Sequence, residues 1–318
     1  MQSYVLLKKI NVQKANAIAG LTYGFPAITN FLGFAHGLSR KLPSKLKVAL
    51  GGVCIVSHKN DIRAHKPDGF GDYTFSLTRN PLDENGDTSP INEEGCMNMQ
   101  VSLLIEVVGD NLLNNGVSSS LKAQIQRLLP TMRLAGGLIT DFESCEVITD
   151  EVTQRKAIRT LAPGFVLFDR SEYLEEHFSN LKSKNDNASL FDAWCDFVKL
   201  KYKATPFEGL PTDDREKATW GYVPKPNSAE PKPGYLIPIA SGYYAISELY
   251  EPGVVDSVRD NSVPVTFAET AYSVGEWRSV SCIRNINDAV WKYTNEHPWY
   301  LVKTDRVEID ILEPDVTV

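Results

Sequence analysis

The chain has 318 residues, of which 42% are hydrophobic and 23% charged, close to the averages of globular proteins. This composition excludes disorder, collagen and coiled coil as descriptions of the whole chain, and no apolar run approaches the roughly 18 residues of a membrane helix. The first nine residues lack the apolar core of a signal peptide, and the five cysteines form no C-x-x-C pair. We therefore expect a cytoplasmic protein with reduced cysteines and no membrane association.

The net charge of -7 is unevenly distributed along the sequence. Residues 1–82 contain eleven lysines and arginines but only three acids, so this segment carries +8 and the remainder -15. A basic first quarter on an acidic body is typical of a protein that binds a polyanion. An ordinary solvated lysine surface without a partner explains the same count, and charge alone does not separate the two.

The first half alternates predicted strands and helices. The pattern predicts a strand over 4–13, a helix over 28–42 capped by Thr22 or Thr29, a strand over 47–56 with a bulge at Gly51-Gly52, a half-buried strand over 97–107, a helix with an apolar stripe over 121–132, and a strand from Leu138. This βαββαβ order is that of a ferredoxin-like (RRM-like) fold of the α+β class.

A long insertion, about 58–95, separates the second and third predicted strands. Alternation over 72–79, followed by turn residues, predicts a protruding β-hairpin. It mixes cations with aromatic rings, as sites for single-stranded nucleic acid do: Arg63, His65, Lys66, Tyr73, Phe75 and Arg79. An exposed β-arm made basic to discourage edge pairing fits equally well.

The second half is less regular. We expect helices over 171–181 and 189–202, the second with a capping box, then a proline-rich loop over 203–234, a strand over 235–239, a turn of glycine and tyrosine, and a third helix ending near Asn295. The predicted organisation is a palm over 1–168, containing the 58–95 hairpin, and a C-terminal helical and β region over 169–318. That region would pack on the palm and on partner subunits.

Catalytic and metal chemistry find little support in the sequence. The five histidines show no ligand spacing with cysteines or acids, and the chain has no G-x-S-x-G, P-loop or G-x-G-x-x-G motif. We expect no catalytic residue, no metal and no cofactor.

Two local features are candidates for binding. The run from Arg133 to Gly137 ends in a glycine pair, which serves either as a helix C-cap or as a place where a phosphate approaches the backbone. Tyr23 and Gly24 precede a predicted helix whose N-terminus, with Thr29, is a natural anion site. Gln13 and Asn16 close the preceding strand and could read base edges, whereas Phe25 fits a hydrophobic staple on the core.

Several short motifs, in order over nearly the whole chain, resemble one known family. The motifs are Asn16-Ala17, the segment 19–26, the segment 31–36, Phe75 to Leu82, Glu93 to Gly95, Val101 to Leu104, Met132 to Gly137, Pro163 to Phe165, Pro233 to Ile239, Ser241 to Tyr243, and Gly275 to Trp277. They resemble the crRNA 5′-handle-binding subunit of type I-F CRISPR systems, the second Csy protein, which is of the Cas-five type in the RAMP superfamily. Tyr23 stands where tryptophan is expected and retains the ring.

The resemblance implies a ferredoxin-like palm with a β-hairpin thumb in a non-catalytic subunit of the Csy (Cascade) complex. Its partners would be the crRNA 5′ handle, the large subunit in a heterodimer, the first backbone subunit and, through the complex, double-stranded target DNA. The RNA-binding residues expected from the motifs and the local features are Gln13, Asn16, Tyr23, Gly24, Thr29, His58, Arg63, Arg79, Asn80, Arg133, Gly136 and Gly137.

Two other functions remain open at this point. A metal-independent ribonuclease of the same superfold, processing crRNA, would need a histidine as general acid or base, and His36 and His58 are the histidines near the predicted palm. A protein-interaction scaffold would make no RNA contact at all.

Overall fold

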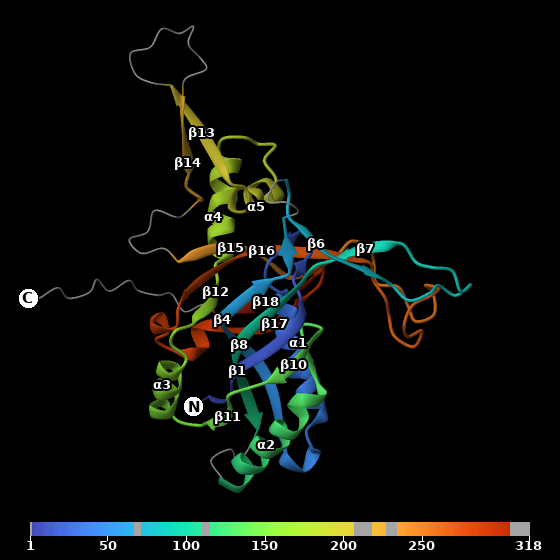
Figure 1. Ribbon diagram of the computed structural model, residues 1–318, viewed down its shortest axis with the longest axis vertical. Coiled ribbons are helices and arrows are strands. Elements are labelled where there is room, and N and C mark those ends of the chain that lie inside the picture. The colour runs from blue at the N-terminus through green and yellow to red at the C-terminus, as the bar shows by residue number, and fades with distance from the viewer. Residues whose placement is uncertain (1, 67–70, 110–114, 207–217, 227–233, 306–318) are drawn as a thin grey trace, which may run out of the picture.

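An eleven-stranded sheet forms the body of the protein in the computed structural model, which describes residues 2–66, 71–109, 115–206, 218–226 and 234–305 (Figure 1). Its strands lie in the order β12 (Phe165–Asp169), β16 (Ala268–Ser279), β15 (Tyr235–Ala245), β18 (Trp299–Thr304), β17 (Val290–Glu296), β4 (Val48–Ile62), β8 (Cys96–Gly109), β1 (Ser3–Asn16), β10 (Gly137–Asp141) and β9 (Arg133–Leu134), and β11 (Ser144–Ile148) also pairs with β1. The mixture of helices and strands confirms the α+β class.

The first half contributes β4, β8, β1 and β10, which are neighbours in that order and antiparallel throughout. Two helices, α1 (Ile28–Lys41) and α2 (Asn115–Leu128), pack on one face through side chains such as Phe31, Leu38 and Ile125. Alternate residues of β8, from Met97 to Val107, supply the sheet side of this core. The strands predicted from residues 4, 47 and 97 and the helix predicted over 28–42 are thus confirmed, and the bulge in β4 falls at Gly51-Gly52.

The opposite face of the same strands is covered at one end only. There α3 (Glu151–Thr160) and two short 3-10 helices, Val280–Cys282 and Ile286–Ala289, enclose a second core that includes Tyr4, Leu6, Val56 and Leu104. Beyond this cover, Asn98 and Gln100 of β8 are only partly buried. The prediction that β8 is half-buried is therefore wrong for its second half, because residues distant in sequence cover the outer face.

The second half joins the sheet through the free edge of β4. Val290 and Trp291 of β17 pair with Cys54 and Val53, and Phe165 and Val166 of β12 pair with Ser57 and Val56. On the neighbouring strands β15 and β16, the helices α4 (Ser171–Lys182) and α5 (Leu190–Val198) form a third small core. The capping box predicted at the start of α5 is confirmed, although this helix ends at Val198 rather than at residue 202.

Three expectations for the second half are wrong. The segment ending near Asn295 is a strand, β17, because its apolar residues are buried at the edge of β4. β15 continues through Gly242 and Tyr243 with a bulge instead of turning there. The proline-rich segment 203–234 is not simply a loop, since β13 (Lys201–Pro206) and β14 (Ala218–Val223) form a hairpin over its described residues.

Two small β units, the insertion and the β2–β3 hairpin, connect the larger elements of the first half. The insertion forms a separate three-stranded sheet of β5 (Ala64–His65), β6 (Thr74–Arg79) and β7 (Ile91–Glu94), which projects from the body (Figure 1). β2 (Ile18–Ala19) and β3 (Thr22–Tyr23) precede α1, and short 3-10 helices follow α1 (Ser44–Leu46) and α2 (Leu129–Thr131). Ala27 caps α1 without a side-chain hydrogen bond, so the expected threonine cap is wrong.

In the described part of the chain, no helix has the length and apolarity to cross a membrane.

A buried ion pair fixes the second half where it meets α4. The Arg170 guanidinium donates to Glu276 Oε2 from Nε and lies 2.7 Å from it through Nη2, and the two side chains are 11% and 4% exposed. Glu276 Oε1 also accepts from the backbone N–H of Gly234 at 2.6 Å. One carboxylate therefore holds together the starts of α4 and β15 and the middle of β16.

We predict that Glu276→Gln lowers the free energy of unfolding by roughly 3 kcal/mol, because it leaves a buried guanidinium without its counter-charge. Urea denaturation of the purified chain measures this loss. Glu172→Gln is the matched control: this carboxylate lies 3.5 Å from Arg170 and is 31% exposed, so its loss should cost at most about 1 kcal/mol. Equal effects of the two substitutions would contradict the central place given to Glu276.

Candidate nucleic-acid interface

The ends of β1, β4 and β8 meet at one edge of the body. Backbone hydrogen bonds join them there: Ala17 N–H donates to Gly95 O, Gly24 N–H to Ala17 O, and Arg63 N–H to Cys96 O, each at 2.9 Å. The side-chain amide of Asn16 forms its hydrogen bonds within the same turn: it accepts from Ile18 N–H and donates to Ile18 O. Asn16, Gly24 and Arg63, which are distant in sequence, are thereby brought together.

Two aromatic rings in the turn before α1 have different surroundings. Tyr23 is 58% exposed and makes an edge contact with Phe75 of the insertion, with ring centroids 5.3 Å apart. Phe25 stacks on Phe31 at 5.4 Å and meets Trp277 edge-on at 5.0 Å. Phe25 is thus packed into the body, as expected of a staple, whereas the Tyr23 ring has a face available to a ligand. Thr29 is half-buried in the first turn of α1.

The glycine pair lies in a tight turn between β9 and β10. Ala135 and Gly136 both have positive φ, at 49° and 75°, and α2 ends at Leu128, so the interpretation as a helix C-cap is wrong. A Cβ on Gly136 would meet no atom within 4 Å, whereas a Cβ on Gly137 would lie 2.7 Å from Gln13 O. Gly137 therefore permits close packing on β1, and Gly136 leaves an open surface.

The same turn is tied to the end of β1. Asn16 N–H donates to Ala135 O at 2.8 Å, and Arg133 Nη1 donates to Gly136 O at 3.1 Å. Gln13, which pairs with Leu138 of β10, is exposed beside it. Five of the expected site residues thus lie in one region: Gln13, Asn16, Arg133, Gly136 and Gly137.

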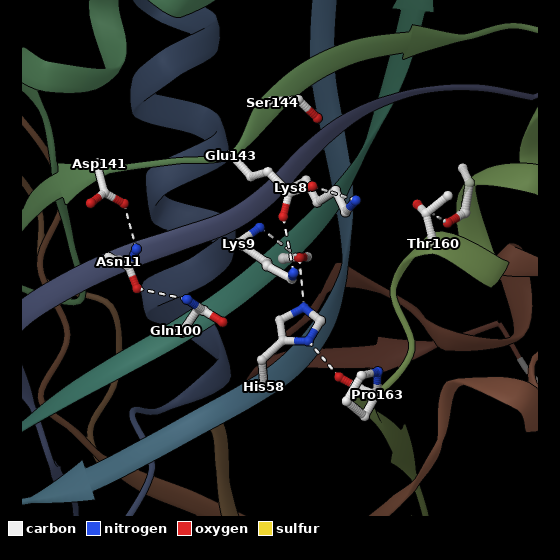
Figure 2. Close-up of polar contacts among 12 residues, drawn as sticks. Lys8, Lys9, Asn11, His58, Gln100, Asp141, Glu143, Ser144, Thr160 and Pro163 are labelled. Atoms are coloured by element: carbon white, nitrogen blue, oxygen red, sulfur yellow. Dashed lines mark hydrogen bonds and ion pairs between the residues drawn. The ribbon is translucent and has the colours of Figure 1, made fainter.

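The uncovered part of the sheet carries polar side chains on the face opposite α1 and α2 (Figure 2). Gln100 of β8 donates to Asn11 Oδ1 of β1 at 2.9 Å, and Asn11 in turn donates to Asp141. Beside them, Lys8 and Lys9 both contact the Glu143 carboxylate, at 2.5 and 3.0 Å. These lysines hold the pKa of Glu143 below its usual range, and the Glu143 carboxylate offsets one of their two positive charges.

His58 lies in this polar face with both ring nitrogens engaged (Figure 2). Nδ1 is 2.9 Å from Pro163 O and Nε2 is 2.7 Å from Ser102 Oγ, which accepts from Lys9 N–H. Nδ1 therefore carries the proton, and Nε2 accepts from the Ser102 hydroxyl. Burial lowers the pKa of His58, with a smaller contribution from Lys9, although the Pro163 carbonyl opposes the shift. The neutral ring acts as a bridge between β4, β8 and the turn before β12.

This geometry predicts a pH dependence of stability. An unfolded histidine has a pKa of about 6.5, so below that pH the unfolded chain takes up a proton that folded His58 resists. The contribution of neutral His58 is present above about pH 6.5 and is lost as the pH falls toward the lowered pKa. His58→Gln should therefore make the fall in unfolding free energy between about pH 7 and pH 5 shallower, as measured by urea denaturation.

A cleft of about 730 Å³ opens next to Tyr23. One side is formed by the turn from Thr22 to Pro26 and by the end of β4, and the other by β15, β16 and the chain before β15. Its side chains combine rings with a cation: Tyr23, Phe25, Asn60, Phe165, Lys225, Tyr235 and Trp277. Lys225 Nζ lies 5.6 Å from the centroid of the Tyr235 ring, and burial lowers the pKa of this lysine.

Sequence reasoning assigned no role to the side of the cleft formed by the second half. Lys225 falls in the proline-rich segment that was expected to be a loop. Tyr235 and Trp277 belong to short motifs that were quoted for the family resemblance only. No sequence pattern joins Lys225 to Tyr235, which lies ten residues further along the chain and is 70% exposed in the structure.

The insertion separates its own candidate residues. Arg63 is exposed at its base, next to Cys96, whereas Arg79 pairs with Ile91 at the outer end of β6 and is followed by exposed Asn80. Arg79 and Asn80 are therefore several residues along the arm from Phe75, the ring that meets Tyr23. Any ligand contacting all of these residues must be long enough to follow the arm.

The comparison with known proteins gives one consistent answer. A family model described as "CRISPR-associated protein (Cas_Csy2)" matches residues 5–302. CRISPR-associated protein Csy2 from Pseudomonas aeruginosa is 35% identical over 313 residues, which cover 93% of this chain and 92% of that protein. The chain belongs to the Csy2 family. The match confirms the type I-F family that the motifs indicated, and its range includes every expected site residue and the whole cleft of this Csy2 family member.

Proposed function

We propose that the chain binds the crRNA 5′ handle as a non-catalytic subunit of the type I-F Csy complex, in the cytoplasm, and so supports crRNA-guided recognition of foreign double-stranded DNA. The observation that carries this proposal is the meeting, at one edge of the body, of the exposed Tyr23 ring, the open Gly136 turn and the 730 Å³ cleft. In this proposal β1, α1, β4, β8, α2 and β10 form the ferredoxin-like palm, whose strand order supports the assignment, and the insertion is the thumb.

The chemistry of this edge suits single-stranded RNA. Bases stack on exposed rings while cations hold phosphates, and Tyr23 with Arg63 and Arg133 offers both. Gly136 allows a phosphate to approach the backbone, since no side chain stands there. The remaining site residues, Gln13, Asn16, Gly24, Thr29, His58, Arg79, Asn80 and Gly137, are proposed to border or shape this surface.

Histidine geometry disfavours the ribonuclease alternative. His58 uses both ring nitrogens in structural hydrogen bonds, so neither is available to a substrate hydroxyl without breaking one. His36 is exposed on α1, on the other side of the sheet from His58. Membership of the Csy2 family supports a role within a complex, with the large subunit and the first backbone subunit as proposed neighbours.

The two rings before α1 provide a matched test. Tyr23→Ala should weaken binding of handle RNA by roughly 1–3 kcal/mol, the usual worth of a base-stacking ring, with little change in melting temperature. Phe25→Ala should cost roughly 3 kcal/mol of stability because it removes a ring packed between Phe31 and Trp277. Fluorescence anisotropy and thermal denaturation of the same samples separate the effects. A large stability loss for Tyr23→Ala with unchanged RNA affinity would contradict the assignment.

The insertion can be tested separately as a gripping element. Replacing residues 65–93 by a short glycine-rich turn should leave the body folded, because Arg63 N–H and Cys96 O already join the two ends. Crosslinking to the handle and recruitment of the first backbone subunit should then fall together. Normal assembly of the shortened protein would exclude the thumb role.

The salt dependence of RNA affinity measures how much the cations of the insertion contribute to RNA binding. Each phosphate contact that is lost reduces the slope of log affinity against log salt by about 0.7 for a single strand. Arg63→Ala and Arg79→Ala should each flatten the slope by about this amount. Arg127→Ala, at an exposed position of α2, should not. Slopes that match the wild type in all three variants would favour the protein-interaction scaffold over an RNA grip by this arm.

A further inference from the structure

A row of four side chains crosses β16, β15, β18 and β17. Tyr244 pairs directly with Glu269 on one side and with Trp299 on the other, and Trp299 pairs with Glu296. Directly opposed residues share a face of a sheet. The row therefore reads carboxylate, phenol, indole, carboxylate along one surface, and we call it the acid–aromatic row.

The members of this row are open to solvent. Tyr244 and Trp299 are 38% and 40% exposed, with ring centroids 4.5 Å apart. Glu269 and Glu296 are exposed, and within the described ranges neither forms an ion pair. Two aromatic faces and two carboxylates without counter-charges are thus presented side by side.

A hollow of about 280 Å³ lies directly behind the row. The next residues inward on the same strands are Ala271, Gly242, Leu301 and Thr294, and Gly242 could carry no side chain because a Cβ would lie 2.0 Å from Tyr300 O. Leu174 of α4 and Leu190 of α5 close the far side. Ala271, Leu301 and Thr294 line the hollow together with Glu296 and Trp299, so it is continuous with the β17 and β18 end of the row.

The lining of the hollow contains a polar atom without a partner. Ser273 is 7% exposed, and its Oγ has no hydrogen bond among the described residues. An unpaired buried hydroxyl costs free energy, which a ligand that donates to it would recover. Ser273 therefore belongs to the wall of the hollow, and its Oγ lacks a hydrogen-bond partner among the described residues. The same wall contains the acidic Glu296 and the aromatic Trp299.

The charges that face the hollow favour a cation. Glu296 and Asp169 line the hollow, and Asp169 accepts from Ser171 N–H at 2.9 Å, while Glu269 lies at the other end of the row. Lys303 is the cation that faces them, so three carboxylates oppose one ammonium group within the described part of this surface. Such a surface repels RNA phosphates and attracts a positively charged side chain.

We propose that the acid–aromatic row and its hollow form a docking site for an arginine side chain of a protein partner within the Csy complex. A guanidinium stacks on the faces of tryptophan and tyrosine and donates in a planar fork to carboxylates. Its planar fork can donate to the Glu296 carboxylate while its face lies on the neighbouring Trp299 ring, which a single ammonium satisfies less well, and Glu269 adds negative charge at the other end of the row. The hollow has the volume of one long side chain, which makes this a single anchoring contact at the centre of an interface.

The first experiment identifies the occupant in the assembled complex, co-expressed with a guide RNA and the sibling subunits. Tyr244→p-benzoylphenylalanine keeps an aromatic ring and introduces a photocrosslinker at the rim. The expected result, by mass spectrometry, is a crosslink to a sibling protein within a few residues of an arginine. Crosslinks confined to RNA, or to a protein segment without an arginine, would overturn the proposal.

The second experiment measures the charge requirement with a matched control. Glu269→Gln combined with Glu296→Gln should reduce retention of the crosslinked sibling at least tenfold, leaving handle RNA affinity and melting temperature unchanged. Glu248→Gln with Glu251→Gln removes the same charge from exposed positions outside the row and should leave retention unchanged. Equal retention by the two double variants would overturn the proposal without affecting the assignment of RNA to the edge that contains Tyr23 and Gly136.

Replacing the crosslinked arginine of the sibling completes the test. Lysine at that position should retain part of the interaction, because it keeps the charge but loses the planar fork. Alanine should lower retention to the level of the Glu269→Gln and Glu296→Gln variant. Wild-type retention with alanine would exclude the arginine as the anchor.

Discussion

The free edge of β4 is the constraint on which the rest of the molecule depends. This strand has 15 residues and pairs with β8 over nearly all of them, while its other edge pairs, among the described residues, with β17 and β12 between Val53 and Ser57. Val53, Cys54, Val56 and Ser57 thus join the two halves of the chain by strand pairing. Beyond Ser57 the edge is released, so Asn60 and Ile62 border the cleft and the chain departs into the insertion. The position at which edge pairing stops therefore decides where a ligand can enter.

Uneven cover of the outer sheet face has an electrostatic consequence. Where α3 and the 3-10 helices cover the sheet, Leu104 and Tyr4 are buried; where they do not, Gln100 and the lysines are found. The charge count along the sequence overstated the positive charge of this surface. Glu143, in the connection between β10 and β11, contacts both Lys8 and Lys9 of β1. Arg133, beside the turn after β9, and Arg63, at the base of the insertion, are the exposed cations that border the proposed RNA edge on these two elements.

The sequence predicted the elements whose burial follows one simple period. α1 and α4 have a single apolar stripe, and the alternation from Met97 to Val107 marked β8. It failed where long-range pairing decides the structure: β17 is short and buried against β4, so its apolar run did not distinguish strand from helix. The glycine pair was expected either at a helix C-cap or as a place where a phosphate approaches, whereas the pairing of β9 with β10 puts it in a hairpin turn that β1 holds. The cleft could not be predicted, because its two sides come from opposite halves of the chain.

The hydrogen bond from Arg63 to Cys96 has a consequence for how this protein can vary. It joins the two stalks of the insertion where they leave the body, so the segment between them is a closed excursion that the main sheet does not sense. Lengthening such an excursion costs little, about 0.6 kcal/mol for each doubling of its length. Arms of different reach can therefore be exchanged on an unchanged body, and a reporter domain grafted at this point would preserve the pairing of β4 with β8.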